Sequence, residues 1–152
     1  MTTIILDAQH VGKAVETTEK LTILQDISFQ LNEGDSLAII GSSGSGKSTL
    51  LGLLAGLDVP TDGEILLAGK PLSQMSEDER ASLRAEHVGF VFQSFQLLES
   101  LTAVENVMLP LELEGKKNAR ERAMELLQRV GLGERTHHYP KQLSGGEQQR
   151  VA

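Results

Sequence analysis

The run from Gly41 to Thr49 is the part of the sequence whose residue types and spacing point most directly to chemistry. It reads Gly-Ser-Ser-Gly-Ser-Gly-Lys-Ser-Thr and fits the pattern G-x-x-x-x-G-K-[ST]. Glycines let the backbone turn tightly, so that successive N–H groups can point at phosphate oxygens. We call Gly41–Thr49 the phosphate loop, and its pattern predicts that the chain binds a nucleotide as its Mg²⁺ complex.

Three side chains of the phosphate loop have separate predicted roles. Lys47 would reach the β- and γ-phosphates, and Ser48 would supply a hydroxyl oxygen to the octahedral Mg²⁺ ion. Thr49 can reach the α-phosphate. The predicted nucleotide contacts in the loop are therefore Gly41, Ser42, Ser43, Gly44, Ser45, Gly46, Lys47, Ser48 and Thr49. The competing interpretation of the same residues is a flexible Gly/Ser loop with a surface lysine, and the flanking elements decide against it.

A second Ser/Gly-rich run lies near the end of the sequence, where Leu143 to Arg150 read Leu-Ser-Gly-Gly-Glu-Gln-Gln-Arg. We call this run the signature segment. Ser144 stands at a helix N-cap position, and Gly145 and Gly146 would expose N–H groups at the positive end of that helix. One nucleotide does not need two anion sites from one domain. Two sites make sense if a second copy of the chain covers the γ-phosphate with this segment.

The elements around the phosphate loop follow the order that the pattern demands. Residues 37–40 form a continuous apolar run, which is typical of a strand buried on both faces of a parallel sheet, and residues 47–55 read as a helix ended by Gly56. Residues 23–31 partly alternate apolar and polar types, which predicts a half-buried strand of an antiparallel sheet. Residues 65–68 and 88–92 are predicted as further strands.

Capping patterns locate the remaining helices. Residues 76–79 and 102–105 each have the pattern of a capping box, and the first should open a helix that reaches about residue 86. We expect Pro110 to kink or stop the second helix, because proline lacks the amide donor. Another helix starts at Asn118, carries apolar residues at helical spacing and ends at Gly131.

Composition limits the classes of function. The 152 residues include 14 Lys and Arg against 21 Asp and Glu, which gives a formal charge of −7 and argues against nucleic acid as a partner. There is no cysteine, which excludes thiolate metal sites and Cys nucleophiles. The most apolar stretch is far shorter than the roughly 20 residues of a membrane-spanning helix. These features, together with an N-terminus that lacks signal-peptide features, predict a cytoplasmic protein.

With the phosphate loop and the signature segment in this order, the sequence resembles the ATP-binding cassette (ABC) family over essentially its whole length. The family's LSGGQ signature is present as LSGGE, with Glu147 in place of glutamine. Three further stretches, residues 56–63, 89–95 and 105–110, look like the LolD/MacB type, which serves lipoprotein release and macrolide or peptide export. The resemblance implies an α/β fold with a RecA-like P-loop NTPase core, an antiparallel β subdomain and a helical subdomain.

The same resemblance assigns residues and partners. Gln93 matches the family's Q-loop glutamine, which contacts Mg²⁺ and the attacking water, and Ser144, Gly145, Gly146 and Glu147 match the signature contacts to the nucleotide. The implied catalytic residues are Gln93 and Ser144, and the implied metal contacts are Ser48 and Gln93. The implied domains are residues 1–93, an ATP-binding core, and residues 94–152, a helical subdomain. The implied partners are a second copy of the chain in a head-to-tail sandwich around ATP and Mg²⁺, and a membrane permease at the inner face of the membrane.

Two departures from the family pattern change these expectations. The family stacks adenine on an aromatic residue near Lys13-Ala14-Val15, but no aromatic residue precedes Phe29 and Val15 is the expected substitute. The family's Walker B aspartate, catalytic glutamate, D-loop and switch histidine follow the signature and are absent from the 152 residues. We therefore expect the chain to correspond to the N-terminal part of an ABC domain, to bind ATP, and not to hydrolyse it alone.

Alternative functions remain beside the transporter ATPase. A non-transport ABC ATPase of DNA repair or translation is disfavoured for three reasons. Only about 50 residues separate Gln93 from the signature segment, the zinc-bearing repair relatives need cysteines, and the tandem translation factors need a second cassette on the chain. A P-loop kinase has no use for the signature segment. A non-catalytic nucleotide-binding piece is a further alternative. Residues 95–101 fit either a docking patch for a membrane partner or the core of the helical subdomain.

Overall fold

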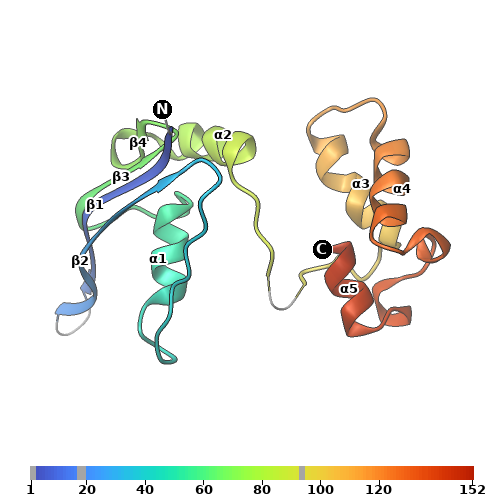
Figure 1. The fold of residues 1–152 in the computed structure, drawn as a ribbon, viewed down its shortest axis with the longest axis horizontal. Helices are drawn as coiled ribbons and strands as arrows, with labels where there is room; N and C mark the ends of the chain where they lie inside the picture. Colours follow the sequence, from blue (N-terminus) through green and yellow to red (C-terminus); the bar gives the residue numbers. More distant parts are fainter. Residues whose placement is uncertain (1–2, 17–19, 93–94) are drawn as a thin grey trace. The chain divides into compact units, whose positions relative to one another are not determined.

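The structure is a computed structural model, and it describes residues 3–16, 20–92 and 95–152. The chain divides into two compact units, Met1–Gly89 and Phe90–Ala152, which we describe separately (Figure 1). The boundary predicted from the sequence follows Gln93, which lies outside the described residues, so the domain assignment stays a prediction.

An antiparallel sheet forms one side of the first unit. Its strands are β1 (Ile4–Glu16), β2 (Lys20–Asn32), β3 (Asp62–Leu67) and β4 (Lys70–Pro71), in the order β2-β1-β3-β4. Figure 1 shows β1 and β2 as two long curved strands that run side by side. The antiparallel sheet predicted from the alternating pattern is therefore confirmed.

The core of the first unit lies between this sheet and the helix that follows the phosphate loop. That helix, α1 (Lys47–Leu54), buries Leu50, Leu53 and Leu54. These leucines belong to one cluster with residues of the sheet and with side chains from η1 (Leu72–Gln74) and α2 (Glu77–His87). The cluster consists of Ala8, Val11, Leu24, Leu50, Leu53, Leu54, Ile65, Leu67, Leu72 and Leu83. Burial against the sheet thus fixes the helix that carries the phosphate loop.

The second unit is helical. It contains α3 (Ala103–Leu113), α4 (Ala119–Arg129), η2 (Gly133–Arg135), η3 (Pro140–Gln142) and α5 (Gly145–Val151). Its core consists of Ala103, Val104, Ala123, Leu127, Leu132, Leu143 and Val151. Leu143, the first residue of the signature segment, and Val151, which follows it, are therefore buried with residues of α3 and α4. In the described parts of the chain, no helix is both long and apolar enough to cross a bilayer.

The predicted capping boxes form at the starts of α2 and α3. The Ser76 amide donates to Glu79 Oε2 at 2.7 Å, and the Thr102 amide donates to Glu105 Oε2 at 2.7 Å. Each carboxylate thereby occupies the first turn, where the positive end of the helix dipole favours a negative charge. The predictions for both helix starts are confirmed.

Pro110 does not stop α3, which continues through Pro110 to Leu113, so this half of the prediction is wrong and the kink stays a prediction. Proline removes one amide donor from the helix, but its carbonyl oxygen remains an acceptor. The Glu114 amide donates to Pro110 O at 3.1 Å, and Lys116 donates to Leu111 O at 2.9 Å. The last turn therefore closes on bonds that do not need the missing donor.

The two strands predicted over residues 37–40 and 88–92 are also wrong. Neither segment pairs with a strand among the described residues, and Ile40 and Val91 are 93% and 77% exposed. An apolar run becomes a strand only when neighbouring chain segments accept and donate its backbone hydrogen bonds. The described residues place no such partner beside these two runs, so neither run joins a sheet.

Candidate functional site

The phosphate loop reaches α1 through a left-handed turn at Gly46. Gly46 has φ +85° and precedes Lys47, the first residue of the helix. A Cβ atom at position 46 would lie 3.1 Å from the Ile23 carbonyl oxygen and 2.9 Å from a Leu24 methyl carbon. The loop thus lies directly against β2, and both the backbone conformation and the space require glycine here.

The Lys47 side chain folds back across the loop that precedes it. Its ammonium group donates to the carbonyl oxygens of Gly41 at 2.9 Å and Ser42 at 2.6 Å. The side chain is half-buried, while residues 41–45 and Ser48 are exposed. The positive charge is therefore held at the mouth of an exposed loop, where an arriving anion can replace the two carbonyl oxygens as its partner.

The N-terminus of α1 is open toward solvent. The first helical bond runs from Leu50 N to Gly46 O at 2.8 Å, so the amides of Lys47, Ser48 and Thr49 precede the helical ladder. No side chain caps this terminus and its first turn has no acidic residue. Free amides, the positive end of the helix dipole and the Lys47 ammonium group together form a site for an anion such as a phosphate chain.

The signature segment enters α5 through a capping box. The Ser144 amide donates to Glu147 Oε2 at 2.8 Å, and the Glu147 amide donates to Ser144 Oγ at 3.3 Å. The Gln148 side-chain amide donates to the carbonyl oxygens of Pro140 at 2.9 Å and Leu143 at 3.1 Å. The start of α5 is therefore fixed by its own side chains.

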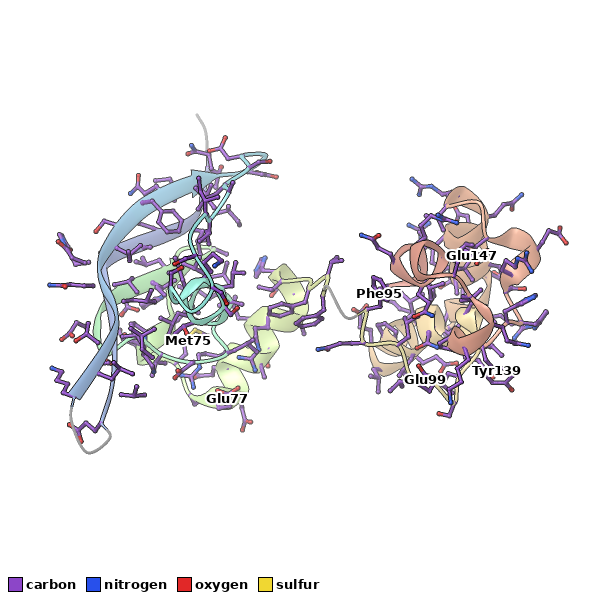
Figure 2. The ribbon with its side chains drawn as sticks, turned by 90° about the horizontal axis from the view of Figure 1, so that it is seen from below. Met75, Glu77, Phe95, Glu99, Tyr139 and Glu147 are labelled. Carbon is purple, nitrogen blue, oxygen red and sulfur yellow. The ribbon has the colours of Figure 1, made fainter. Side chains whose placement is uncertain are left out.

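Glu147, the residue that differs from the family pattern, is paired on both carboxylate oxygens (labelled in Figure 2). Oε2 accepts from Ser144, and Oε1 lies 3.5 Å from Arg135 Nε in η2. The bonds from Ser144 and the nearby charges of Arg135 and Arg150 lower the pKa of Glu147 below its usual range. The carboxylate is thus ionised at neutral pH and occupied by partners within its own unit.

The residues predicted to contact the nucleobase lie on the strands that pack against the phosphate loop. Ala14 pairs with Thr22 and Val15 pairs with Leu21 across β1 and β2. These pairs are next to Ile23 and Leu24, the β2 residues beside Gly46. Val15 and Leu21 are 39% and 58% exposed. Leu21 was not singled out from the sequence; the structure places it opposite Val15, so the two form an exposed apolar pair.

The other predicted site residues are divided between the two units or lie outside the described chain. Gln93 lies outside the described residues, so its place near the phosphate loop stays a prediction. The phosphate loop belongs to the first unit and Ser144 to the second. In the segment that follows Gln93, Leu97 packs against the core of the second unit, whereas Leu98 is 48% exposed. This segment therefore contributes to a core and also leaves an apolar side chain on the surface.

Comparison with known proteins gives consistent matches. Residues 24–152 match the family described as ABC transporter. The chain is 52% identical over 151 residues to the uncharacterized ABC transporter ATP-binding protein YbbA of Escherichia coli K12, covering 97% of this chain and 66% of that protein. It is 50% identical to the uncharacterized ABC transporter ATP-binding protein MJ1508 of Methanocaldococcus jannaschii, covering 97% and 67%.

Solved structures match the fold of the chain as well. A dimeric post-hydrolysis structure of the ATP-binding cassette MJ0796, bound to ADP and Pi, superposes with a TM-score of 0.84 and 38% identity. A second dimeric structure of MJ0796, described as a bacterial ABC transporter cassette, gives a TM-score of 0.83. Each superposition covers 96% of this chain and 66% of the other. The chain thus spans about two thirds of the length of the proteins that it matches.

Proposed function

The chain belongs to the ABC transporter family of ATP-binding proteins, and from this premise we propose that it binds MgATP through the phosphate loop. The α/β fold class predicted for the chain is confirmed by its match to ABC cassettes. The observation that carries the proposal is the Lys47 ammonium group, held beside the uncapped N-terminus of α1 at the mouth of an exposed loop.

The proposed contacts follow from the geometry of the loop. The β- and γ-phosphates would take the place of the Gly41 and Ser42 carbonyl oxygens as partners of Lys47, and the backbone amides of the loop would donate to the phosphate oxygens. The exposed Ser48 hydroxyl would provide one oxygen to Mg²⁺, which keeps several water ligands. Thr49 would contact the α-phosphate. The other residues of the loop would also contact the phosphates: Gly41, Ser42, Ser43, Gly44, Ser45 and Gly46.

The base would lie at the end of the hairpin formed by β1 and β2. Val15 and Leu21 form an exposed apolar pair there, two or three residues along the strands from the residues that touch Gly46. Aliphatic side chains contact a base without the stacking that an aromatic ring provides. We therefore expect affinity to come mainly from the phosphates and Mg²⁺.

Hydrolysis is proposed for a dimer rather than for the single chain. Two dimeric MJ0796 structures at 38% identity support a second copy as partner. In this proposal Ser144, Gly145, Gly146 and Glu147 of one copy would face the γ-phosphate held by the other copy. Gln93 would contact Mg²⁺ and the attacking water. We expect the 152-residue chain alone to bind MgATP without steady turnover.

Coupling to transport is proposed through a separate membrane permease. The segment after Gln93, with Leu98 exposed, is the proposed docking region, and it would place the protein at the cytoplasmic face of the membrane. The similarity of residues 56–63, 89–95 and 105–110 to the LolD/MacB type supports export or extraction of lipoproteins or other lipids as the driven process.

The test of the proposal is calorimetric titration of MgATP into the wild-type chain and the Lys47→Ala variant. The variant loses a charge-assisted contact of about 1.5–3 kcal/mol, so affinity should fall at least tenfold. Lys70→Ala is the matched control, because Lys70 is an exposed lysine of β4 in the same unit. Equal affinity of the wild type and Lys47→Ala would overturn the assignment.

A further inference from the structure

The end of α1 that is opposite the phosphate loop is fixed by a tight backbone turn. Gly56 adopts φ +70°, its amide donates to Leu53 O at 3.0 Å, and the Leu57 amide donates to Gly52 O at 2.9 Å. These two bonds satisfy carbonyl groups that a helix C-terminus otherwise leaves free. The chain therefore leaves α1 in one defined direction, with the Gly56 carbonyl group at the turn.

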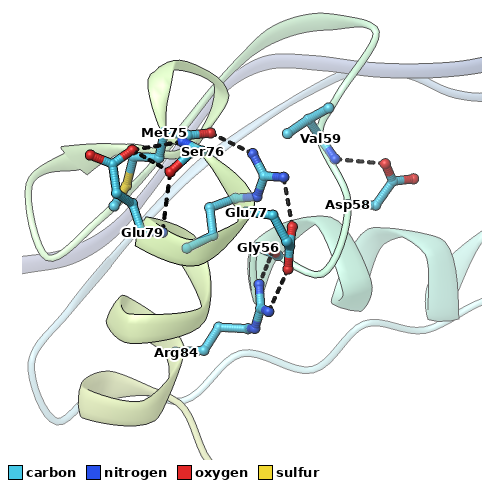
Figure 3. A network of polar contacts seen from close by, with 9 residues as sticks. Gly56, Asp58, Val59, Met75, Ser76, Glu77, Glu79 and Arg84 are labelled. Carbon is cyan, nitrogen blue, oxygen red and sulfur yellow. Dashed lines mark hydrogen bonds and ion pairs between the residues drawn. The ribbon is translucent and has the colours of Figure 1, made fainter.

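The cation at this end of α1 comes from another element of the unit. α1 has no basic residue in its last turn. Instead, Arg84 of α2 donates from Nη1 to the Gly56 carbonyl oxygen, as Figure 3 shows. The Arg84 side chain is only 18% exposed. A half-buried guanidinium group thus sits where the negative end of the α1 dipole favours positive charge.

Glu77 determines the orientation of this guanidinium group. Its carboxylate accepts from Arg84 Nη2 through Oε1 at 2.7 Å and from Arg80 Nη2 through Oε2 at 2.7 Å. The bonds from Arg84 and then Arg80 lower the pKa of Glu77, so the carboxylate is ionised at neutral pH. Arg80 in turn donates to the Met75 carbonyl oxygen at 2.7 Å. The network in Figure 3 therefore ties α1 to the first turns of α2.

A second cation holds the segment after α1 from the side of the sheet. Lys13 of β1 donates to the Val59 carbonyl oxygen at 2.8 Å and pairs with Asp58 Oδ2 at 2.6 Å. Asp58 has its pKa lowered chiefly by this contact with Lys13. The residues that follow α1 are thus attached both to α2 and to the sheet, whereas the start of α1 is open.

We propose that Arg84 is a positioning residue for the phosphate loop: it fixes the C-terminus of α1 and thereby the direction of the amides at its N-terminus. The inference rests on the proposed function of the loop. Eight helical residues span about 12 Å, so a tilt of about 5° at the anchored end moves the other end by about 1 Å. Binding geometry tolerates only about 0.5 Å. Loss of the Arg84 contact should therefore weaken MgATP binding without removing any group that touches the nucleotide.

The experiment compares MgATP affinity, measured by calorimetry, among wild type, Arg84→Ala, Arg84→Lys and Glu77→Gln. Arg84→Ala should weaken binding about three- to tenfold, and Arg84→Lys should recover most of this loss because an ammonium group can still donate to Gly56 O. Arg122→Ala is the matched control, since Arg122 forms an exposed ion pair with Glu125 in the other unit. It should bind MgATP as wild type does.

A spectroscopic readout separates positioning from a general loss of stability. In the nucleotide-free chain, the backbone amide resonances of Gly46, Lys47 and Ser48 should shift in Arg84→Ala and stay unchanged in Arg122→Ala. A folded Arg84→Ala variant with wild-type affinity and unshifted loop resonances would overturn the proposal. If Arg84→Ala does not fold, Glu77→Gln decides. It removes the carboxylate charge and leaves one oxygen to accept from both Arg80 and Arg84, so the Arg84 guanidinium group is held less firmly. Binding should weaken about twofold or more, and unchanged affinity would overturn the proposal.

The same measurements distinguish a failure of the proposed nucleotide site from a failure of the role of Arg84. Failure of Lys47→Ala to weaken binding would remove the proposed function itself. Weak binding by Lys47→Ala together with wild-type binding by folded Arg84→Ala would leave the nucleotide site intact and remove only the role of Arg84.

Discussion

The phosphate loop and the signature segment each carry a Ser/Gly-rich turn into the start of a helix, but they leave that helix start in different states. At α1 the residue before the helix is Gly46, and no side chain caps the terminus. The Lys47 ammonium group lies in the same loop and donates to two of its carbonyl oxygens. At α5 the Ser144 and Glu147 side chains already occupy the terminus. The α1 terminus therefore has donors available for the proposed phosphate chain, whereas side chains of the chain itself already cap the α5 terminus.

Among substitutions in these two segments, that of the glycine before α1 should have the largest effect on stability and on MgATP binding. Gly46→Ala places a Cβ atom at a positive φ and 3.1 Å from the Ile23 carbonyl oxygen. We expect it to lower the free energy of unfolding by about 1–3 kcal/mol and to abolish measurable MgATP binding. Urea denaturation and calorimetry measure the two effects. Wild-type stability of the variant would show that the turn does not require glycine.

Removal of the α5 cap should have the next largest effect. Ser144→Ala deletes the oxygen that accepts from the Glu147 amide, and loss of an N-cap of this kind costs about 0.5–2 kcal/mol. MgATP binding by the single chain should stay unchanged. Ser144→Thr is the control, because threonine keeps the hydroxyl group. Chemical denaturation of the three proteins checks the expectation, and a loss of nucleotide affinity in Ser144→Ala would contradict it.

Substitution of a glycine at the start of α5 by alanine should stabilise the chain, whereas the same substitution at Gly46 should destabilise it. A Cβ atom on Gly146 would meet nothing closer than an Arg150 side-chain nitrogen at 3.9 Å. Gly146→Ala should therefore raise the free energy of unfolding by about 0.4–1 kcal/mol, because alanine restricts the unfolded chain. Thermal unfolding of the variant measures this effect. Destabilisation instead would mean that α5 is strained at this position.

At acid pH, protonation of Glu147 should reduce its contribution to the stability of the signature segment. The pKa of Glu147 is lower in the folded chain than in the unfolded chain, so its stabilising contribution is present above about pH 4.3 and is lost as the pH falls further. Glu147→Gln keeps an oxygen acceptor and removes the charge. The stability difference between wild type and this variant should shrink from pH 7 to pH 3. A constant difference would show that the charge does not contribute.

The preference of the wild-type chain for one base over another should be the smallest effect. With Val15 and Leu21 in place of an aromatic ring, ATP and GTP should bind within a few-fold of each other, because the phosphates are common to both. Stacking on a ring is worth about 1–3 kcal/mol, so Val15→Tyr should tighten ATP binding about fivefold or more. Competition binding with both nucleotides measures these ratios. A hundredfold preference of the wild type for ATP would show that another group reads the adenine.

Local signals in the sequence predicted much of this molecule. The start of α1 at Lys47 and the capping boxes at Ser76 and Thr102 depend on residues close together in the chain, and the structure confirms them. The antiparallel sheet is also confirmed, although the alternating pattern did not specify that β1 pairs with the distant strand β3. The strand predicted over residues 37–40 was wrong because an apolar run does not specify its partner. Pro110 did not stop α3, because the bonds that close its last turn use carbonyl acceptors.

The candidate site was predictable only where its residues are contiguous. The phosphate loop and the signature segment are short motifs, so their residues could be named from the sequence. Arg84 could not, because it reaches the site through a contact between distant elements, its bond to the Gly56 carbonyl group. This contact depends on how α2 packs beside the end of α1, which no local pattern encodes.

We expect the free chain to bind MgATP at the open terminus of α1 and not at the capped terminus of α5. Titration of MgATP into the isotope-labelled chain, at a concentration where it is monomeric, tests this claim through the backbone amide resonances of both segments. Large shifts are expected at Gly41–Thr49 and none at Gly145, Gly146 and Glu147. Shifts at the three α5 residues with an unchanged phosphate loop would contradict it.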